Sequence, residues 1–339
     1  MRAIELNAFG AQNLTLVERE KTPPQDHEIQ IQMKAVSLNY RDLLMVRGLY
    51  NPRQSLPFIP LSDGVGIVTK TGPHVTRFKV GDRVCPIFAQ GWHSGVPSKI
   101  KTKRTLGGPV DGTLQEFMTL DEEDAVHAPE HLSNDQAACL PCAGVTAWSA
   151  LVTQGQIKVG DSVLIQGTGG VSMFAMHFAL AAGARVIMTS SSDEKLERVR
   201  QAGVHHTINY RNDLDWGKTA KKLAGGDGVD HVVEVGGAGT LKSSLKAVRP
   251  GGSIYLIGVL SGTAQELNLL PILMQNIRVQ GILVGHRESF EDMNRAIDRH
   301  QIKPEISHIF PWTEAEQAFE IMASGSHFGK IVLSFDEAQ

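Results

Sequence analysis

The chain has few cysteines, no long apolar run and almost no net charge. Three cysteines, Cys85, Cys139 and Cys142, are too few for a disulfide framework or a four-thiolate zinc site. No run of about eighteen apolar residues is present, and the N-terminal segment lacks the apolar core of a signal peptide. We therefore expect a cytoplasmic protein.

The net charge of −3 gives no general attraction to nucleic acid or to a membrane, so we expect neither as a partner. One basic run, Lys99 to Arg104, lies in a loop flanked by glycine and proline. We interpret it as a solvated loop; steering of an anionic substrate such as a CoA ester is the alternative.

What the chain does contain is enough apolar sequence for two full cores. Its 339 residues are 42% apolar and 20% charged, as in an ordinary globular protein. Up to about residue 130 the pattern is of short strands and turns rather than helices, which predicts a barrel-like β domain. An aperiodic loop over 88–110 is long enough to be a lid or a binding loop.

From residue 131 the pattern changes to alternating strands and helices with roughly six strands, which predicts an α/β fold with a doubly wound parallel sheet. Residues 305–339 have an irregular, β-like texture that we expect to rejoin the first domain. The predicted domains are therefore 1–130 with 305–339, and 131–304.

The stretch from Asp161 to Ser192 carries the strongest signal. Residues 162–166 are a β-branched apolar run, 167–170 a glycine turn and 171–182 an apolar helix, and a second strand follows at 184–189. The glycines let a pyrophosphate approach the backbone, and the helix offers it free N–H groups. We predict dinucleotide binding, with a purely structural turn as the alternative.

This strand–turn–helix–strand segment departs from the usual dinucleotide-binding pattern in two places. Ser172 stands where the third glycine is usual, which still allows close packing. The second strand ends in hydroxyls, Thr189 to Ser192, with Lys195 one turn into the next helix, where an NAD site would carry an acid. This favours NADP(H). Alternatively, Ser191 is the helix N-cap and Glu194 completes a capping box, and both interpretations can hold together.

Seven stretches together match one family. They are AVSLNYRD (35–42), SDGVGIV (62–68), VGDRV (80–84), LPCAGVTAWSAL (140–151), GTGGV (167–171), VVEVGG (232–237) and SHFGKIVL (326–333). They resemble the medium-chain dehydrogenase/reductase superfamily, specifically its zinc-independent, quinone-oxidoreductase-like branch. The resemblance implies a GroES-like β-rich catalytic domain and a Rossmann domain, an active site between them, and homodimers formed through the edges of the Rossmann sheets.

Zinc alcohol dehydrogenases of this superfamily hold a catalytic metal with Cys, His and Cys. The matching positions here are Asn39, Ser62 and Cys142, and the loop over 88–110 lacks the four cysteines of the structural zinc lobe. Amides and hydroxyls compete poorly for Zn²⁺. We predict no zinc, and interpret Cys142 as a packing residue, with a working thiol as the alternative.

Without a metal, hydride addition to a quinone or an α,β-unsaturated carbonyl is less demanding than oxidation of an alcohol, because the negative charge is delocalised. The resemblance places Asn39 and Asp42 beside the nicotinamide, and Tyr50 in a substrate pocket with Ser62 and Trp92. Tyr50 is the predicted donor to the substrate oxygen. Its alternative is a half-buried packing aromatic, with water supplying the proton.

The resemblance also implies a set of cofactor contacts. The predicted NADPH-binding residues are Asn39, Thr146, Gly169, Gly170, Val171, Ser190, Ser191, Lys195, Tyr210, Ile257, Gly258, Leu283, Val284 and Lys330.

The sequence thus predicts an NADPH-dependent, zinc-free reductase of a quinone or an activated double bond in a small apolar molecule. One alternative is an NADP(H)-dependent alcohol dehydrogenase or aldehyde reductase. Another is an NADPH-binding sensor or partner-binding protein with little turnover.

Overall fold

The computed structural model describes residues 1–335, and these form two compact units. The β-rich unit comprises Met1–Val145 and the chain from Gly285 on, and the parallel-sheet unit comprises Thr146–Val284. Residues 336–339, which belong to the predicted first domain, lie outside the described part. No helix within residues 1–335 is long and apolar enough to cross a membrane.

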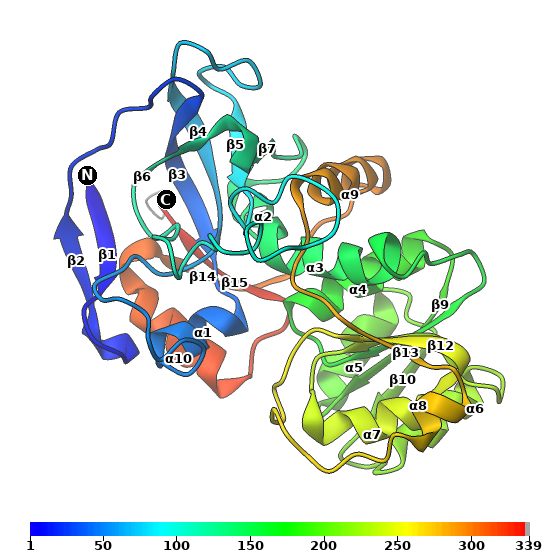
Figure 1. The fold of residues 1–339 in the computed structure, drawn as a ribbon. Coiled ribbons are helices and arrows are strands. Elements are labelled where there is room, and N and C mark those ends of the chain that lie inside the picture. Colours follow the sequence, from blue (N-terminus) through cyan, green and yellow to red (C-terminus); the bar gives the residue numbers. More distant parts are fainter. Residues whose placement is uncertain (336–339) are drawn as a thin grey trace. The chain divides into compact units, whose positions relative to one another are not determined.

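The β-rich unit is built around a seven-stranded sheet whose central strand is β3 (Figure 1). Its strand order is β14-β15-β3-β4-β5-β7, and β6 also pairs with β3, while β1 and β2 form a separate pair. The strands are β1 (Arg2–Leu6), β2 (Leu14–Glu18), β3 (Glu28–Ser37), β4 (Asp63–Thr71), β5 (Arg83–Pro86), β6 (Phe117–Asp121), β7 (Ala125–His127), β14 (Ile306–Pro311) and β15 (Lys330–Ser334). Ile29, Ile31 and Met33 alternate along β3 and are buried in the core of this unit, as a strand period of two requires.

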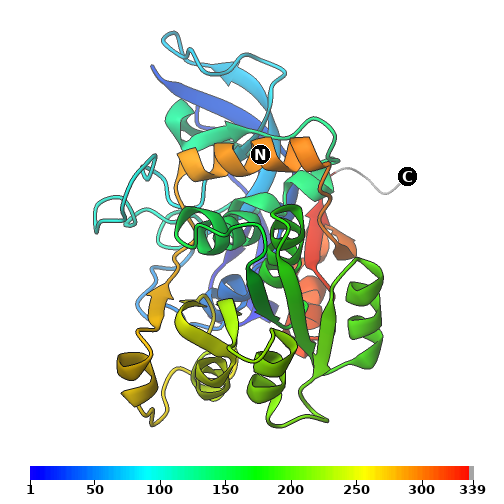
Figure 2. The same ribbon diagram turned by 90° about the vertical axis from the view of Figure 1, so that its right-hand side faces the viewer.

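Two helices, α1 (Tyr40–Val46) and α10 (Ala315–Ser324), correct the prediction that the first domain contains strands and turns without helices. The helix α9 (Arg287–His300) also belongs to this unit. The contacts group residues 131–145 and 285–304 with the β-rich unit, whereas the sequence analysis placed them in the second domain. The reason is packing: α9, the orange helix in the upper part of Figure 2, lies against β7. There Asn294 Nδ2 donates to His127 O at 2.9 Å.

The parallel-sheet unit contains a six-stranded, fully parallel sheet in the order β10-β9-β8-β11-β12-β13. Counted along this unit, that is the order 3-2-1-4-5-6 of doubly wound nucleotide-binding sheets. The strands are β8 (Ser162–Gln166), β9 (Arg185–Ser190), β10 (His206–Asn209), β11 (Val229–Glu234), β12 (Val248–Leu256) and β13 (Arg278–Gly281). The predicted fold class, an α/β chain with a β-rich domain and a parallel-sheet domain, is confirmed.

Helices connect these strands and pack on the sheet (Figure 1). They are α4 (Gly170–Ala181), α5 (Asp193–Gln201), α6 (Trp216–Leu223), α7 (Ala238–Ala247) and α8 (Leu270–Met274). The strand order reverses direction between β8 and β11. In such sheets the ligand crevice lies at the carboxyl ends of the two strands that flank this switch point.

The chain between Ser133 and Thr153 is helical but irregular. Helix α2 (Asn134–Ala137) starts at Ser133, whose hydroxyl accepts from Gln136 N. Wide π turns then flank the short α3 (Val145–Trp148), one over Leu140–Gly144 and the other over Ser149–Thr153.

Candidate functional site

The turn from β8 into α4 is built to receive an anion. Gly167 has φ +70°, which favours glycine, and Gly169 is the N-cap of α4 with no side-chain cap. A Cβ added to Gly169 would meet no atom within 4 Å, so the space before the helix is open. The first N–H groups of α4, from Gly170 and Val171 onward, have no partner within the helix. These features fit the pyrophosphate of a dinucleotide.

Ser172 supports this turn as the predicted substitute for the third glycine. Its side chain is buried, and its hydroxyl donates to Gln166 O at 2.7 Å. The serine therefore ties the first turn of α4 to the end of β8, while its small size preserves close packing.

Across the switch point, Glu234 at the end of β11 organises the neighbouring turn. Its fully buried carboxylate accepts from Gln166 Nε2 at 2.7 Å, from the N–H groups of Gly236 and Gly237, and from two hydroxyls. The strand ends of β8 and β11 are thereby fixed to one another. In the sequence, Glu234 stands out only as the acid of the motif VVEVGG; an acid shortly before two glycines is the signal for this role.

The end of β9 carries the groups predicted to choose between NADP and NAD. Parallel pairing places Asn209 of β10 beside Ser190, and Tyr210 N donates to Ser190 O at 3.1 Å. Tyr210 is 40% exposed at this edge. Burial, followed by the charge of Arg198, lowers the pKa of Lys195.

One detail of this segment was wrong in the sequence analysis. Ser192, not Ser191, is the N-cap of α5, and its hydroxyl accepts from Lys195 N. The third residue after this cap is Lys195, so Glu194 does not complete a capping box. Ser191 is left half-buried just before the helix.

The remaining predicted cofactor residues of the parallel-sheet unit lie near the ends of its elements. Thr146 is buried at the start of the unit. Gly258, shortly after β12, packs so closely on the backbone of Val235 that an added Cβ would lie 2.5 Å from Val235 O. Ile257 N donates to Glu234 O at 2.9 Å. Leu283 is 42% exposed, and Val284 is buried with φ +46°, a strained conformation for a β-branched residue. Such strain is concentrated at functional positions.

The β-rich unit contains a buried polar cluster centred on Lys330, which is only 3% exposed. Its ammonium donates to Asn39 Oδ1 at 2.6 Å and to Leu38 O at 2.7 Å, and contacts Asp63 Oδ2 at 3.3 Å. Lys330 as a cofactor ligand stays a prediction; the contacts of its ammonium in this structure are with groups of its own unit. The antiparallel register of β15 on β3 explains these contacts. Val332 pairs with Ser37, so Lys330, two residues earlier in β15, comes near Asn39, two residues beyond Ser37.

Lys330 decides which way the amide of Asn39 points. An ammonium has no acceptor, so the atom that faces it must be the amide oxygen. The Nδ2 group then faces Ser62 Oγ, 3.5 Å away, at the limit of a hydrogen bond. A hydrogen bond from the Asn39 side chain also acts on Asp63 and works to lower the pKa of that carboxyl, and the neighbouring Ser62 is fully buried.

Asp42 holds the backbone of the same asparagine. Its Oδ2 accepts from Asn39 N at 2.8 Å at the start of α1, and its Oδ1 lies 3.3 Å from Arg41 Nη1. Burial raises the pKa of Asp42 to about 6 despite the neighbouring guanidinium. Burial also raises the pKa of Asp63, against the opposing effect of Lys330.

The three positions that would hold a catalytic metal form a poor donor set. Asn39 Oδ1 is already bound to an ammonium, and Ser62 offers a hydroxyl. Burial raises the pKa of the Cys142 thiol, whereas a metal ligand must be a thiolate. Within residues 1–335, no group of three or more His, Cys, Asp or Glu side chains is arranged to hold a metal ion.

Tyr50 lies on the surface of the β-rich unit with half of its area exposed. The guanidinium of Arg41 stacks on its ring at 5.1 Å and also donates to Leu106 O and Gly108 O. No hydrogen bond joins the Tyr50 hydroxyl to another residue of the described chain. The ring is therefore held while the hydroxyl stays available, as its predicted role requires; the sequence analysis did not foresee Arg41.

Trp92 differs from its predicted place in a substrate pocket. Its side chain is only 5% exposed, and Nε1 donates to Gly95 O at 2.9 Å. The indole also packs edge-on against His286 at 5.9 Å. These contacts hold Trp92 within the structure of its own loop and against His286.

Two family models match the chain: one falls within the β-rich unit, and the other covers most of the parallel-sheet unit and continues into α9. Residues 25–130 match the alcohol dehydrogenase GroES-like domain, and residues 170–299 match the zinc-binding dehydrogenase domain. A zinc-type alcohol dehydrogenase-like protein of Schizosaccharomyces pombe is 43% identical over 315 residues, covering 91% of each chain. The chain belongs to the medium-chain dehydrogenase/reductase family.

Some of the similar proteins are named alcohol dehydrogenases, and others are named quinone oxidoreductases. The quinone oxidoreductase of Rattus norvegicus is 28% identical over 345 residues, covering 98% of this chain and 97% of its own. A Sinorhizobium meliloti structure assigned provisionally as an alcohol dehydrogenase superposes with a TM-score of 0.93 at 42% identity, covering 98% of both chains. This medium-chain dehydrogenase/reductase is therefore an NAD(P)-dependent oxidoreductase.

Proposed function

We propose that this chain is an NADPH-dependent, zinc-free reductase that transfers hydride to a quinone or an α,β-unsaturated carbonyl compound. The observation that carries the proposal is the contact of 2.6 Å between Lys330 Nζ and Asn39 Oδ1. It places a positive charge at the position where a zinc alcohol dehydrogenase carries a cysteine ligand of its metal.

The charge of Lys330 disfavours zinc in two ways. It repels a second cation at the same position, and it engages the oxygen with which Asn39 would coordinate. The raised pKa of Cys142 adds the cost of removing its proton. The chemistry that remains is one in which hydrogen-bond donors receive the developing negative charge.

Asn39 and Tyr50 are the proposed donors to the substrate oxygen. When bound, NADPH supplies the hydride; the enolate or hydroquinone oxygen that results accepts hydrogen bonds from preorganised N–H and O–H groups. Lys330 fixes the amide of Asn39, and Arg41 fixes the ring of Tyr50. Neither donor needs to reorganise as charge develops.

The preference for NADPH is supported by the end of β9. Ser190, Ser191 and Lys195 offer hydroxyls and an ammonium there, and no acid follows the strand before Asp193. A 2′-phosphate would offset the mutual repulsion of Lys195 and Arg198 that contributes to the lowered pKa of Lys195.

An NADP(H)-dependent alcohol dehydrogenase or aldehyde reductase is the second candidate. It is favoured by relatives named alcohol dehydrogenase, among them a Geobacillus stearothermophilus protein at 30% identity. The donors on Asn39 and Tyr50 could polarise a carbonyl in the same way. An NADPH-binding sensor would keep the nucleotide site but would show little turnover.

We also propose a homodimer formed through the edge of the parallel sheet. Strand β13 is an edge strand, and the nearby α8 exposes Leu270, Leu273 and Met274 by 60%, 71% and 74%. Such an apolar surface is typical of a protein interface. A mass of two chains in light scattering is expected, and a single chain at micromolar concentration would contradict it.

Zinc analysis of the purified protein tests the zinc-free proposal. We expect far less than one zinc per chain after dialysis against a chelator, with NADPH binding intact. One zinc per chain that resists dialysis, and that is lost in Cys142→Ala, would refute it.

A further inference from the structure

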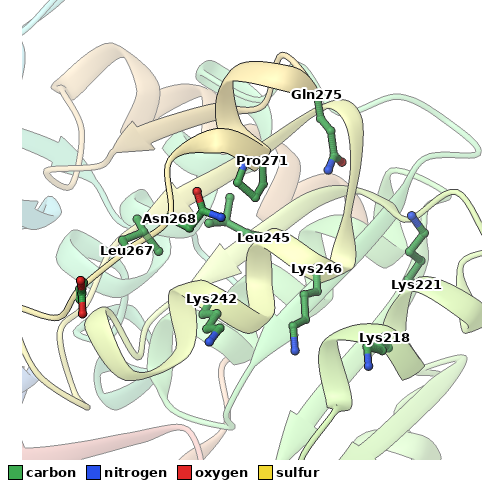
Figure 3. A pocket seen from close by; sticks show the side chains of 10 residues that line it. Lys218, Lys221, Lys242, Leu245, Lys246, Leu267, Asn268, Pro271 and Gln275 are labelled. Atoms are coloured by element: carbon green, nitrogen blue, oxygen red, sulfur yellow. The ribbon is translucent and has the colours of Figure 1, made fainter.

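A pocket of about 420 Å³ on the parallel-sheet unit is lined by four lysines (Figure 3). Lys218 and Lys221 extend from α6, and Lys242 and Lys246 from α7. The other wall is the chain from residue 266 through α8, which contributes the amides of Asn268 and Gln275. Glu266 is the only acid that lines the pocket.

Close helix packing forces these lysines together. A Cβ on Gly217 would lie 2.2 Å from the backbone oxygen of Ser243, so α6 and α7 meet at backbone contact. The lysines of α6 are three residues apart and those of α7 four apart, so each pair lies on one helix face. Like charges at these spacings are unfavourable.

One carboxylate pairs with two of the four lysines. Asp215 binds Lys218 at 3.0 Å and Lys246 at 3.1 Å, and the hydrogen bonds and charges of these two lysines lower the pKa of Asp215. Neither Lys221 nor Lys242 forms an ion pair within residues 1–335. Two ammonium groups and two side-chain amides therefore remain for a ligand.

We propose that this pocket binds a small anion carrying two or more phosphate groups, apart from the nucleotide turn at Gly169. A diphosphate brings several negative charges into a compact space, and lysine binds phosphate as a point charge. The pocket is concave and limited by α8, and the chain is net negative, so a small anion fits better than an extended nucleic acid.

The experiment is calorimetric titration of the full chain, saturated with NADPH, with inorganic pyrophosphate at about 150 mM salt. We expect saturable binding that is weakened about tenfold or more in K221Q/K242Q, because each lysine provides a charge-assisted contact. Lys222→Gln is the matched control: it removes the same charge from the same helix but from a residue that does not line the pocket. All three side chains are at the surface, so the variants should fold.

Three results would overturn the proposal. They are no binding of pyrophosphate by the wild type, equal binding by K221Q/K242Q, and equal weakening by Lys222→Gln, which would indicate general charge attraction. Tighter binding of a DNA duplex than of pyrophosphate would also contradict it. Failure of NADPH to saturate the protein would count against the proposed function instead, since K221Q/K242Q leaves the nucleotide turn unchanged.

Discussion

Lys330 Nζ lies 2.6 Å from Asn39 Oδ1, although the two residues are 291 positions apart in the chain. The pair joins the start of β15 to the residue before α1 and turns the amide nitrogen of Asn39 toward Ser62. The proposed oxyanion donor is therefore oriented by a buried cation of the same unit.

Asn39→Asp tests the N–H donors of Asn39 separately from its contact with Lys330. The carboxylate keeps the shape of the side chain and its contact with Lys330 but removes the N–H donors. We expect a turnover about 100-fold lower, and a lower thermal stability because the new carboxylate would lie beside the buried Asp42 and Asp63. Steady-state kinetics and a melting curve measure both; full activity would remove Asn39 from the proposed mechanism.

Lys330→Met tests the cost of the buried charge. Asp63 is fully buried and would lose its cationic partner, so we expect a loss of about 3–5 kcal/mol in the free energy of unfolding. Lys330→Arg should recover part of it. Denaturant unfolding provides the measurement, and a loss of less than about 1 kcal/mol would show that the pair is not stabilising.

Tyr50→Phe removes only the hydroxyl. The ring remains stacked under Arg41, so stability should not change. If the hydroxyl donates to the substrate, kcat/KM should fall about tenfold or more. Unchanged kinetics would assign Tyr50 to packing.

Lys195→Ala tests the choice of cofactor. It should weaken NADPH about tenfold or more and NADH little, because only NADPH carries a 2′-phosphate that can accept a charge-assisted hydrogen bond from Lys195. Fluorescence titration with both cofactors measures this, with Lys222→Ala as the control. Equal weakening of the two cofactors would remove the case for a 2′-phosphate site.

Asp42 predicts a pH dependence of stability. Because its folded pKa is raised to about 6, the native state binds more protons than the unfolded chain between about pH 4 and pH 6. Stability should therefore fall as the pH rises through this range, by about 2–3 kcal/mol. Asp63 acts in the same direction. Asp42→Asn should flatten the profile by the contribution of Asp42, and an identical slope in the variant would contradict the assignment.

Much of the fold was predictable because its signals are local. The β-branched run before Gly167 and the apolar run after Gly170 each identify an element without reference to the rest of the chain. Helix α9 was missed although Phe290, Met293 and Ile297 recur at helical spacing and are buried. His286, which caps α9 by accepting from Ser289 N, was not recognised as a start signal.

The buried polar cluster around Lys330 was less predictable because it depends on long-range pairing. The sequence identified Asn39, Asp42 and Lys330 separately, through the family resemblance. That Lys330 holds Asn39 follows only from the register of β15 on β3, and that Arg41 holds Tyr50 depends on a loop whose carbonyls fix the guanidinium. No local pattern contains either relationship.

The most direct test of the central proposal is NADPH oxidation with a panel of quinones, enones and simple aldehydes in the presence of a zinc chelator, followed by absorbance. We predict turnover of quinones or enones with NADPH at a rate that the chelator does not change. Activity confined to aldehydes, or activity lost to the chelator and restored by Zn²⁺, would contradict the zinc-free reductase.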